Sequence, residues 1–157
     1  MPSNTSGGRN DNMLTPKYLF EQLNNIFKFD VDAACIKANS LCDEGFYFDL
    51  GFDGLTQVWG NRAIFCNPPF SQKAKWMEKA HWEVTEGNCP VCVMLLPTNS
   101  MDASCWHDWV YSKCHRYDIL NRRVAFIDPA TGKPKKGNDS GLTIVYFLRK
   151  IVVPKGG

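Results

Sequence analysis

The sequence lacks any apolar run long enough to span a bilayer as a helix, which takes about 20 consecutive residues. Residues 1–12 are polar and rich in Gly, Ser and Asn, and they lack the apolar centre of a secretion signal. These absences favour a cytoplasmic protein with no membrane contact. We expect residues 1–12 to be a disordered tail and residues 153–157 to be a short C-terminal tail.

The chain also lacks a strong excess of charge of either sign. Its 18 Lys and Arg residues and 16 Asp and Glu residues give a formal net charge of +2. Such a balance neither supports nor excludes nucleic-acid binding, because the local distribution of charge matters more. The densest basic cluster is Lys133, Lys135 and Lys136, with Arg122 and Arg123 shortly before it. It is either a solvated loop or a phosphate-contacting loop, and its place after a predicted strand favours phosphate contact.

A disulfide framework and a complete zinc motif are missing as well. The seven cysteines are an odd number, and without a secretion signal we expect free thiols. Cys89 and Cys92 have the spacing of a metal or redox motif, but no second such pair exists. Cys92 also falls in a predicted strand, which favours buried thiols. The cysteines and histidines of residues 105–115 are better explained by helical packing, so no metal is expected.

Length and composition predict one globular domain, with 157 residues of which 44% are hydrophobic and 22% charged. We place this domain at residues 13–152. Apolar and aromatic runs predict strands at 27–34, 63–66, 91–96, 117–120, 123–127 and 142–148. Helices are predicted from residue 15, over 72–85 and over 102–111, the last capped by Asp102. Residues 35–53 are predicted to be irregular.

Strands that alternate with helices predict an α/β fold with a mostly parallel sheet. The last two predicted strands, 123–127 and 142–148, are joined by a loop at 128–140 that is rich in Pro, Gly, Lys and Asn. They are expected to form an antiparallel hairpin at the sheet edge.

The first helix has a start signal of its own. Thr15 is predicted to be its N-cap and Pro16 its first helical residue. A spacing near 3.6 then predicts an apolar face made of Tyr18, Leu19, Leu23 and Ile26.

The most informative stretch is the tetrapeptide Asn67-Pro68-Pro69-Phe70, which follows the apolar run at 63–66. Its two prolines fix φ and remove two backbone donors, and the first pushes Asn67 out of the α region. A side-chain amide and an aromatic ring on a stiff corner suit a planar group that carries an amine. At the end of an α/β strand, where ligand crevices form, this indicates amino-methyl transfer to a nucleobase. The alternative is a rigid turn after an edge strand.

The tetrapeptide resembles the catalytic motif of the amino-methyltransferases, in which Asp, Asn or Ser precedes Pro-Pro and an aromatic residue. Phe70 stands in place of the commoner tyrosine. The wider chain resembles the compact DNA adenine N6-methyltransferases of phages and prophages. The resemblance covers roughly residues 14–148, and its ordered pieces are Thr15-Pro16, Asp32, Asn39, Cys42, Asp53-Gly54-Leu55, Trp59, Trp76, residues 95–97, Trp106-His107 and residues 123–126.

The resemblance implies a compact class I, Rossmann-like methyltransferase that uses S-adenosylmethionine and flips its target adenine out of DNA. Asn67 and the carbonyl of Pro68 would accept hydrogen bonds from the adenine amine, and Phe70 would stack on the base. Pro69 completes the catalytic set. Related motifs also serve cytosine N4, RNA adenine and protein glutamine methylation, and these remain alternatives. A non-catalytic DNA-binding protein on a methyltransferase scaffold is a further one.

The glycine-rich turn common to class I methyltransferases is absent. Asp32-Ala33-Ala34 stands in its place, and small residues let a ligand approach the backbone much as glycine does. Asp32 would accept hydrogen bonds from the ammonium group of the methyl donor. The alternative is a capping or turn aspartate.

Four further residues are implied cofactor contacts. Asp53 would bind the ribose hydroxyls or the adenine amine of the donor, although an Asx-turn at Asp53-Gly54 also explains it. Thr15 and Pro16 match a family position near the cofactor, as does Asn67.

DNA contact is expected from the basic residues Arg122, Arg123, Lys133, Lys135 and Lys136. They would bind phosphates without reading sequence, while Asn138 is a candidate for reading an adenine edge. The expected partner is duplex DNA with a short recognition sequence, bound by a monomer or weak homodimer.

Overall fold

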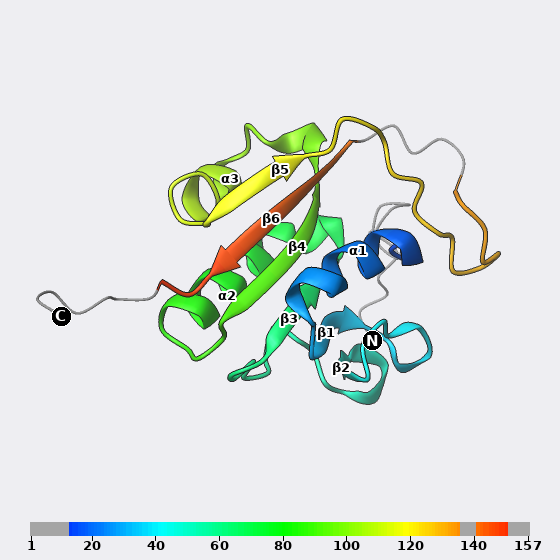
Figure 1. Ribbon diagram of the computed structural model, residues 1–157, viewed down its shortest axis with the longest axis horizontal. Helices are drawn as coiled ribbons and strands as arrows, with labels where there is room; N and C mark the ends of the chain where they lie inside the picture. The colour runs from blue at the N-terminus through cyan, green and yellow to red at the C-terminus, as the bar shows by residue number, and fades with distance from the viewer. Residues whose placement is uncertain (1–12, 136–140, 151–157) are drawn as a thin grey trace, which may run out of the picture.

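The computed structural model describes residues 13–135 and 141–150, which form a six-stranded sheet with helices on both faces (Figure 1). The strands are β1 (Val31–Cys35), β2 (Glu44–Tyr47), β3 (Ala63–Cys66), β4 (Val91–Pro97), β5 (Arg116–Ile119) and β6 (Leu142–Leu148). The α-helices are α1 (Lys17–Phe27), α2 (Lys73–Thr85) and α3 (Ser104–Trp109), and short 3-10 helices are η2 (Lys37–Asn39), η3 (Phe48–Leu50), η4 (Phe70–Gln72) and η5 (Thr98–Ser100). No helix among the described residues has the length and apolar character needed to cross a membrane.

The strand order is β2-β1-β3-β4-β6-β5. The first four strands in sequence run parallel, and β6 lies antiparallel to both β4 and β5. The predicted α/β class, with a mostly parallel sheet and an antiparallel pair, is therefore confirmed.

Apolar packing on both faces explains why the central strands are continuous apolar runs. Every residue of β3 and β4 is buried. On one face, Leu19 and Phe20 of α1 pack in a cluster with Phe65 of β3. On the other face, α2 and α3 contribute Trp76 and Trp106 to a second cluster. The sheet is thus the middle layer of three, with α1 on one side and α2 and α3 on the other (Figure 1).

The sheet has its topological switch point at β1, which lies between β2 and β3. After β1 the chain forms β2 on one side of β1 and then β3 on the other side. The carboxyl ends of β1 and β3 are therefore neighbours. Ligand crevices of open α/β sheets form at such a point. Asp32 of β1 is in register with Phe65 of β3, and Asn67 directly follows the end of β3. Both predicted site segments therefore lie at one edge of the sheet.

The predicted C-terminal hairpin is wrong in its first strand. β6 pairs with β5, not with residues 123–127, and it lies inside the sheet rather than at the edge. Ile127 forms only isolated bridges, to Leu14 and Pro134. Val124 and Phe126 are buried in the cluster around α1, so their alternation with exposed neighbours comes from packing on a helix and not from a strand ladder.

The start of α1 also differs from the prediction. The helix begins at Lys17, and Pro16 is the N-cap residue, so Thr15 is not the cap. Tyr18 and Ile26 are 45% and 72% exposed. The buried face of α1 is formed instead by Leu19, Phe20 and Leu23.

Three other boundaries need correction. The strand predicted at 27–34 begins only at Val31, because α1 continues to Phe27 and Lys28 ends it in the left-handed region, at φ 53°. Residues 35–53 are not wholly irregular, since they contain β2. Asp102 does not cap α3, which has Ala103 at its N-cap.

Candidate active site

The side-chain amide of Asn67 is held in one orientation. Its Nδ2 donates to the backbone oxygen of Met13 at 3.1 Å and to Oγ1 of Thr15 at 2.9 Å. A backbone carbonyl only accepts hydrogen bonds, so the nitrogen and not the oxygen must face Met13. Because both amide protons are used inside the protein, the group that Asn67 presents to a ligand is its oxygen.

The rest of the tetrapeptide forms a supported corner. Pro68 is buried, and Pro69 precedes η4, where its carbonyl accepts a hydrogen bond from the backbone of Gln72 at 2.9 Å. The half-buried ring of Phe70 meets Phe126 edge to face, with ring centroids 6.1 Å apart. Phe126 thus supports Phe70 from the side, a contact between segments far apart in sequence that sequence reasoning did not predict.

Asp32 is a buried carboxylate, only 3% exposed. Burial raises its pKa from 3.8 to about 6, partly opposed by backbone hydrogen bonds from Leu41 and Ala34. No ion pair to Asp32 is found among residues 13–135 and 141–150. A buried charge without a cationic partner is costly, so this position favours a positively charged ligand. The hydrogen bond from Leu41 gives Asp32 a structural role too, as the turn alternative requires.

The loop that carries Asp53 is pressed against the end of β1. A Cβ atom on Gly54 would lie 2.1 Å from the Ala33 carbonyl oxygen and 2.8 Å from the Trp76 ring, so only glycine fits there. Asp53 Oδ1 accepts a hydrogen bond from the backbone of Leu55 at 2.9 Å, which is the Asx-turn alternative. The structure therefore brings Asp53 beside the Asp32–Ala34 segment, while a direct ligand contact by Asp53 stays a prediction.

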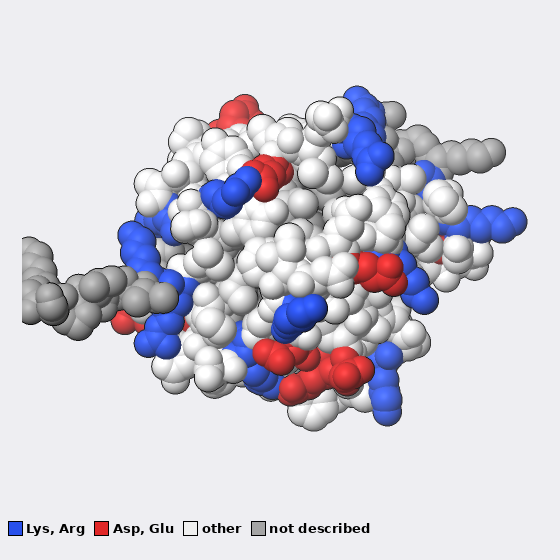
Figure 2. Space-filling view, viewed as in Figure 1, with Lys and Arg blue, Asp and Glu red and all other residues white. Residues whose placement is uncertain are grey.

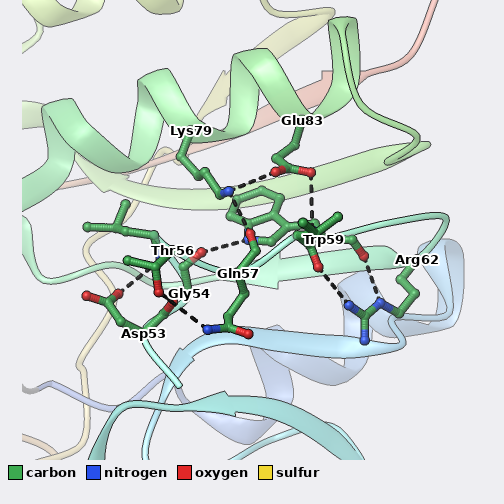
Figure 3. A network of polar contacts seen from close by, with 10 residues as sticks. Asp53, Gly54, Thr56, Gln57, Trp59, Arg62, Lys79 and Glu83 are labelled. Carbon is green, nitrogen blue, oxygen red and sulfur yellow. Dashed lines mark hydrogen bonds and ion pairs between the residues drawn. The ribbon is translucent and has the colours of Figure 1, made fainter. Parts of the chain in front are cut away.

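Helix α2 holds this loop through a polar network that sequence reasoning missed (Figure 3). The Trp59 indole donates to the Gly54 carbonyl at 2.9 Å, and the Trp59 backbone donates to Glu83 at 3.2 Å. Lys79 forms an ion pair with Glu83 at 2.7 Å and donates to the backbone oxygen of Gln57 at 2.6 Å. The sequence signal was a Lys–Glu pair four residues apart, which by spacing alone indicates only an ordinary helix surface.

The predicted DNA-contacting residues follow β5. Arg122, Arg123 and Lys133 are exposed, and Lys135 is half-buried with its backbone nitrogen 2.8 Å from the Phe126 oxygen. Figure 2 shows basic side chains over this segment, at the upper right. Since Phe126 also touches Phe70, the basic segment borders the tetrapeptide. Lys136 and Asn138 lie outside the described residues, as do the predicted tails.

The thiols of Cys89 and Cys92 are buried and free. Burial raises the pKa of the Cys89 thiol to about 12, which disfavours the thiolate needed for metal or redox chemistry. Trp106 is fully buried, as a core residue should be. No group of three or more His, Cys, Asp or Glu side chains suited to a metal ion is found in the described part of the chain.

The chain is similar to known proteins along nearly its whole length. The family model for DNA N-6-adenine-methyltransferase (Dam) matches residues 2–156. The chain belongs to this family. The resemblance carried by the ordered motifs is thereby confirmed.

Two phage proteins are similar to this member of the family over nearly its whole length. A DNA N-6-adenine-methyltransferase of Haemophilus phage HP1 (strain HP1c1) is 30% identical over 152 residues, which cover 94% of this chain and 84% of the relative. A DNA N-6-adenine-methyltransferase of Escherichia phage T1 is 26% identical over 167 residues, covering 95% of this chain and 67% of the relative.

The buried charge of Asp32 predicts a pH-dependent stability difference. Between pH 4 and 6 the native carboxyl retains a proton that the unfolded chain releases, so the free energy of unfolding falls as pH rises and levels off above pH 6. Asp32→Asn removes the free-energy cost of burying the ionised carboxylate. Denaturant unfolding should show the variant gaining up to about 3 kcal/mol on the wild type between pH 4 and pH 7.5. Exposed Asp43→Asn is the control, and a pH-independent difference for Asp32→Asn would contradict the assignment.

Breaking the contact between α2 and the Asp53 loop should loosen that loop. Glu83→Gln removes a partly buried charge that pairs with Lys79, and we expect a loss of about 1–3 kcal/mol in the free energy of unfolding. Hydrogen exchange should become faster at the Trp59 backbone amide. Glu86→Gln, at the exposed end of the same helix, should change neither quantity. Equal behaviour of the two variants would show that the network does not hold the loop.

Proposed function

We propose that this chain transfers a methyl group from S-adenosylmethionine to the exocyclic N6 amine of adenine in DNA. Family membership supports the reaction class. The observation that carries the proposal is the orientation of Asn67, whose amide protons bond to Met13 and Thr15, so that its oxygen is the atom left to accept a hydrogen bond from a ligand.

The adenine amine is a weak nucleophile because its lone pair is delocalised into the ring. S-adenosylmethionine would supply the methyl group from its sulfonium, and the sulfur would keep the electron pair of the broken carbon–sulfur bond as a neutral thioether. The Asn67 oxygen and the Pro68 carbonyl accept hydrogen bonds from the two amine protons, which favours a lone pair directed at that methyl group. Asn67 is neutral and cannot take the proton, so the surplus proton leaves the methylated amine for solvent. The chain contributes electrostatic stabilisation and proximity.

The target base must leave the duplex stack to reach Asn67, at a cost of a few kcal/mol. Phe70 offsets part of this cost by stacking on the base. The perpendicular contact with Phe126 holds the Phe70 ring in place for this stacking.

Asp32, Ala33, Ala34 and Asp53 fit the cationic cofactor. Asp32 is a buried carboxylate without a cationic partner among the described residues, so it suits the ammonium group of the donor. Ala33 is fully buried in the core, so Ala34, which is half-buried, is the small residue that a ligand can approach. The Thr15 hydroxyl accepts a hydrogen bond from Asn67 and can still donate its own proton to the cofactor. Thr15 and Pro16 therefore connect the catalytic and cofactor ends of the proposed site.

Arg122, Arg123, Lys133 and Lys135 would contact phosphates on either side of the target adenine. Their segment follows β5 and reaches the tetrapeptide through Phe126. In a phage-encoded enzyme this reaction would take place in the host cytoplasm.

Replacing the catalytic acceptor tests the function directly. Asn67→Ala should lower methyl transfer by about 100-fold or more, the effect of losing an oriented polar group in an active site. Its affinity for S-adenosylmethionine, measured by calorimetry, should change little. Nucleosides of DNA from an unmethylated expression host are analysed by mass spectrometry, with Asn61→Ala as the exposed control. Near-normal N6-methyladenine formation by Asn67→Ala would contradict the proposed mechanism. N4-methylcytosine formed by the wild type would show that the reaction is cytosine N4 methylation instead.

The support that Thr15 gives to Asn67 generates a separate prediction. Thr15→Val keeps the shape but removes the acceptor of the amide proton, so the amide loses its fixed orientation. We expect kcat to fall about 10-fold, the value of one net hydrogen bond. Thr15→Ser should restore kcat. Equal kcat in the Val and Ser variants would remove Thr15 from this role.

A further inference from the structure

A groove lies between α1 and the segment that follows β5, outside the catalytic corner. It encloses about 320 Å³. Its floor is apolar and includes Leu19 of α1 and Ile144 of β6. The side chains with polar atoms that line it are Tyr18, Gln22, Asn121 and Arg122. Within residues 13–135 and 141–150, no carboxylate lines the groove, so the electrostatic character of its described lining suits an anionic ligand.

The same strip of chain lines the groove and supports the active site. Val124 lines the groove, and two residues later Phe126 contacts Phe70. On the opposite side, α1 begins just after Thr15, which bonds to Asn67. The groove and the catalytic corner are therefore neighbours on one surface.

Chain length limits how far apart the two sites lie. A residue spans at most about 3.6 Å, so Tyr18 of the groove and Thr15 are no more than roughly 11 Å apart along the chain. The Thr15 hydroxyl lies 2.9 Å from the Asn67 amide. DNA rises about 3.4 Å per base pair. DNA that delivers an adenine to Asn67 would therefore place a base within about six positions of the target at the groove.

The groove has the chemistry to bind a base. Carboxamides such as Gln22 and Asn121 can pair with an adenine edge through two hydrogen bonds, and Arg122 can pair with guanine or a phosphate. Tyr18, which is 45% exposed, offers a ring for stacking. A volume near 320 Å³ is at the lower end for small-ligand sites, which suits one nucleotide.

We propose that this groove binds one base that flanks the target adenine and thereby sets the sequence that is methylated. The inference rests on the proposed function and adds to it the part of the chain that reads sequence. Gln22 and Asn121 read the base edge, Tyr18 packs on the ring, and Arg122 holds the adjoining phosphate.

Sequencing-based mapping of N6-methyladenine in an unmethylated host tests the groove. Gln22→Ala and Asn121→Ala should lower discrimination at one flanking position by roughly 10-fold, the effect of losing a bidentate base contact. Methylation of the preferred sequence should fall by that factor, while methylation of sequences changed at that position and cofactor affinity stay within about 2-fold of the wild type. Asn25→Ala, an exposed carboxamide on the same helix outside the groove, is the matched control. Unchanged discrimination in both Gln22→Ala and Asn121→Ala, or an equal loss on every sequence, would overturn the proposal.

A second measurement separates this inference from the proposed reaction. Fluorescence anisotropy of short duplexes, varied one base at a time, measures binding without methyl transfer. If the wild type forms no N6-methyladenine, the proposed reaction fails. The groove inference is then supported only if the wild type discriminates among duplexes and Gln22→Ala does not. A wild type that binds all duplexes equally overturns it.

Discussion

The hydrogen bonds from the Asn67 amide to Met13 and Thr15 join the end of β3 to the start of α1. The same helix packs Phe20 against Phe65, with ring centroids 5.1 Å apart, two residues before Asn67 in the sequence. Packing therefore places the helix, and the helix orients the amide. The orientation of the Asn67 amide therefore depends on the core contact between α1 and β3.

A second constraint acts at the neighbouring strand, where the fold buries a carboxylate at a stability cost. Asp32 has a raised pKa because the switch point encloses it, while the packing of Gly54 on Ala33 keeps the adjoining loop close. Helix α2 holds that loop through Glu83 and Trp59. The two helices thus have separate tasks: α1 fixes the Asn67 amide that we propose as the acceptor, and α2 supports the loop next to the buried charge.

The sequence predicts well what depends on local pattern. β3, β4 and β6 are continuous apolar runs, and α2 has one clear apolar face, so their bounds were predicted to within about a residue. The edge strand β2 was missed because only Phe46 of its residues is buried. Thr15 looked like a helix cap because its actual partner, Asn67, is distant in the sequence. The roles of Phe126, Glu83 and the Asp53 loop depend likewise on contacts between separate segments, which a single sequence does not encode as a pattern.

The position of β6 has a consequence for how the sheet is completed. Among the described strands, β5 pairs only with β6, and β6 also pairs with β4. During synthesis, β5 therefore has no partner until the later residues of β6 emerge and enter between it and β4. The intervening segment, which carries the groove wall and the basic residues, leaves and re-enters the sheet at neighbouring points. Val124 and Phe126 of this segment belong to the core, whereas its exposed residues can change in type without altering the register of any strand.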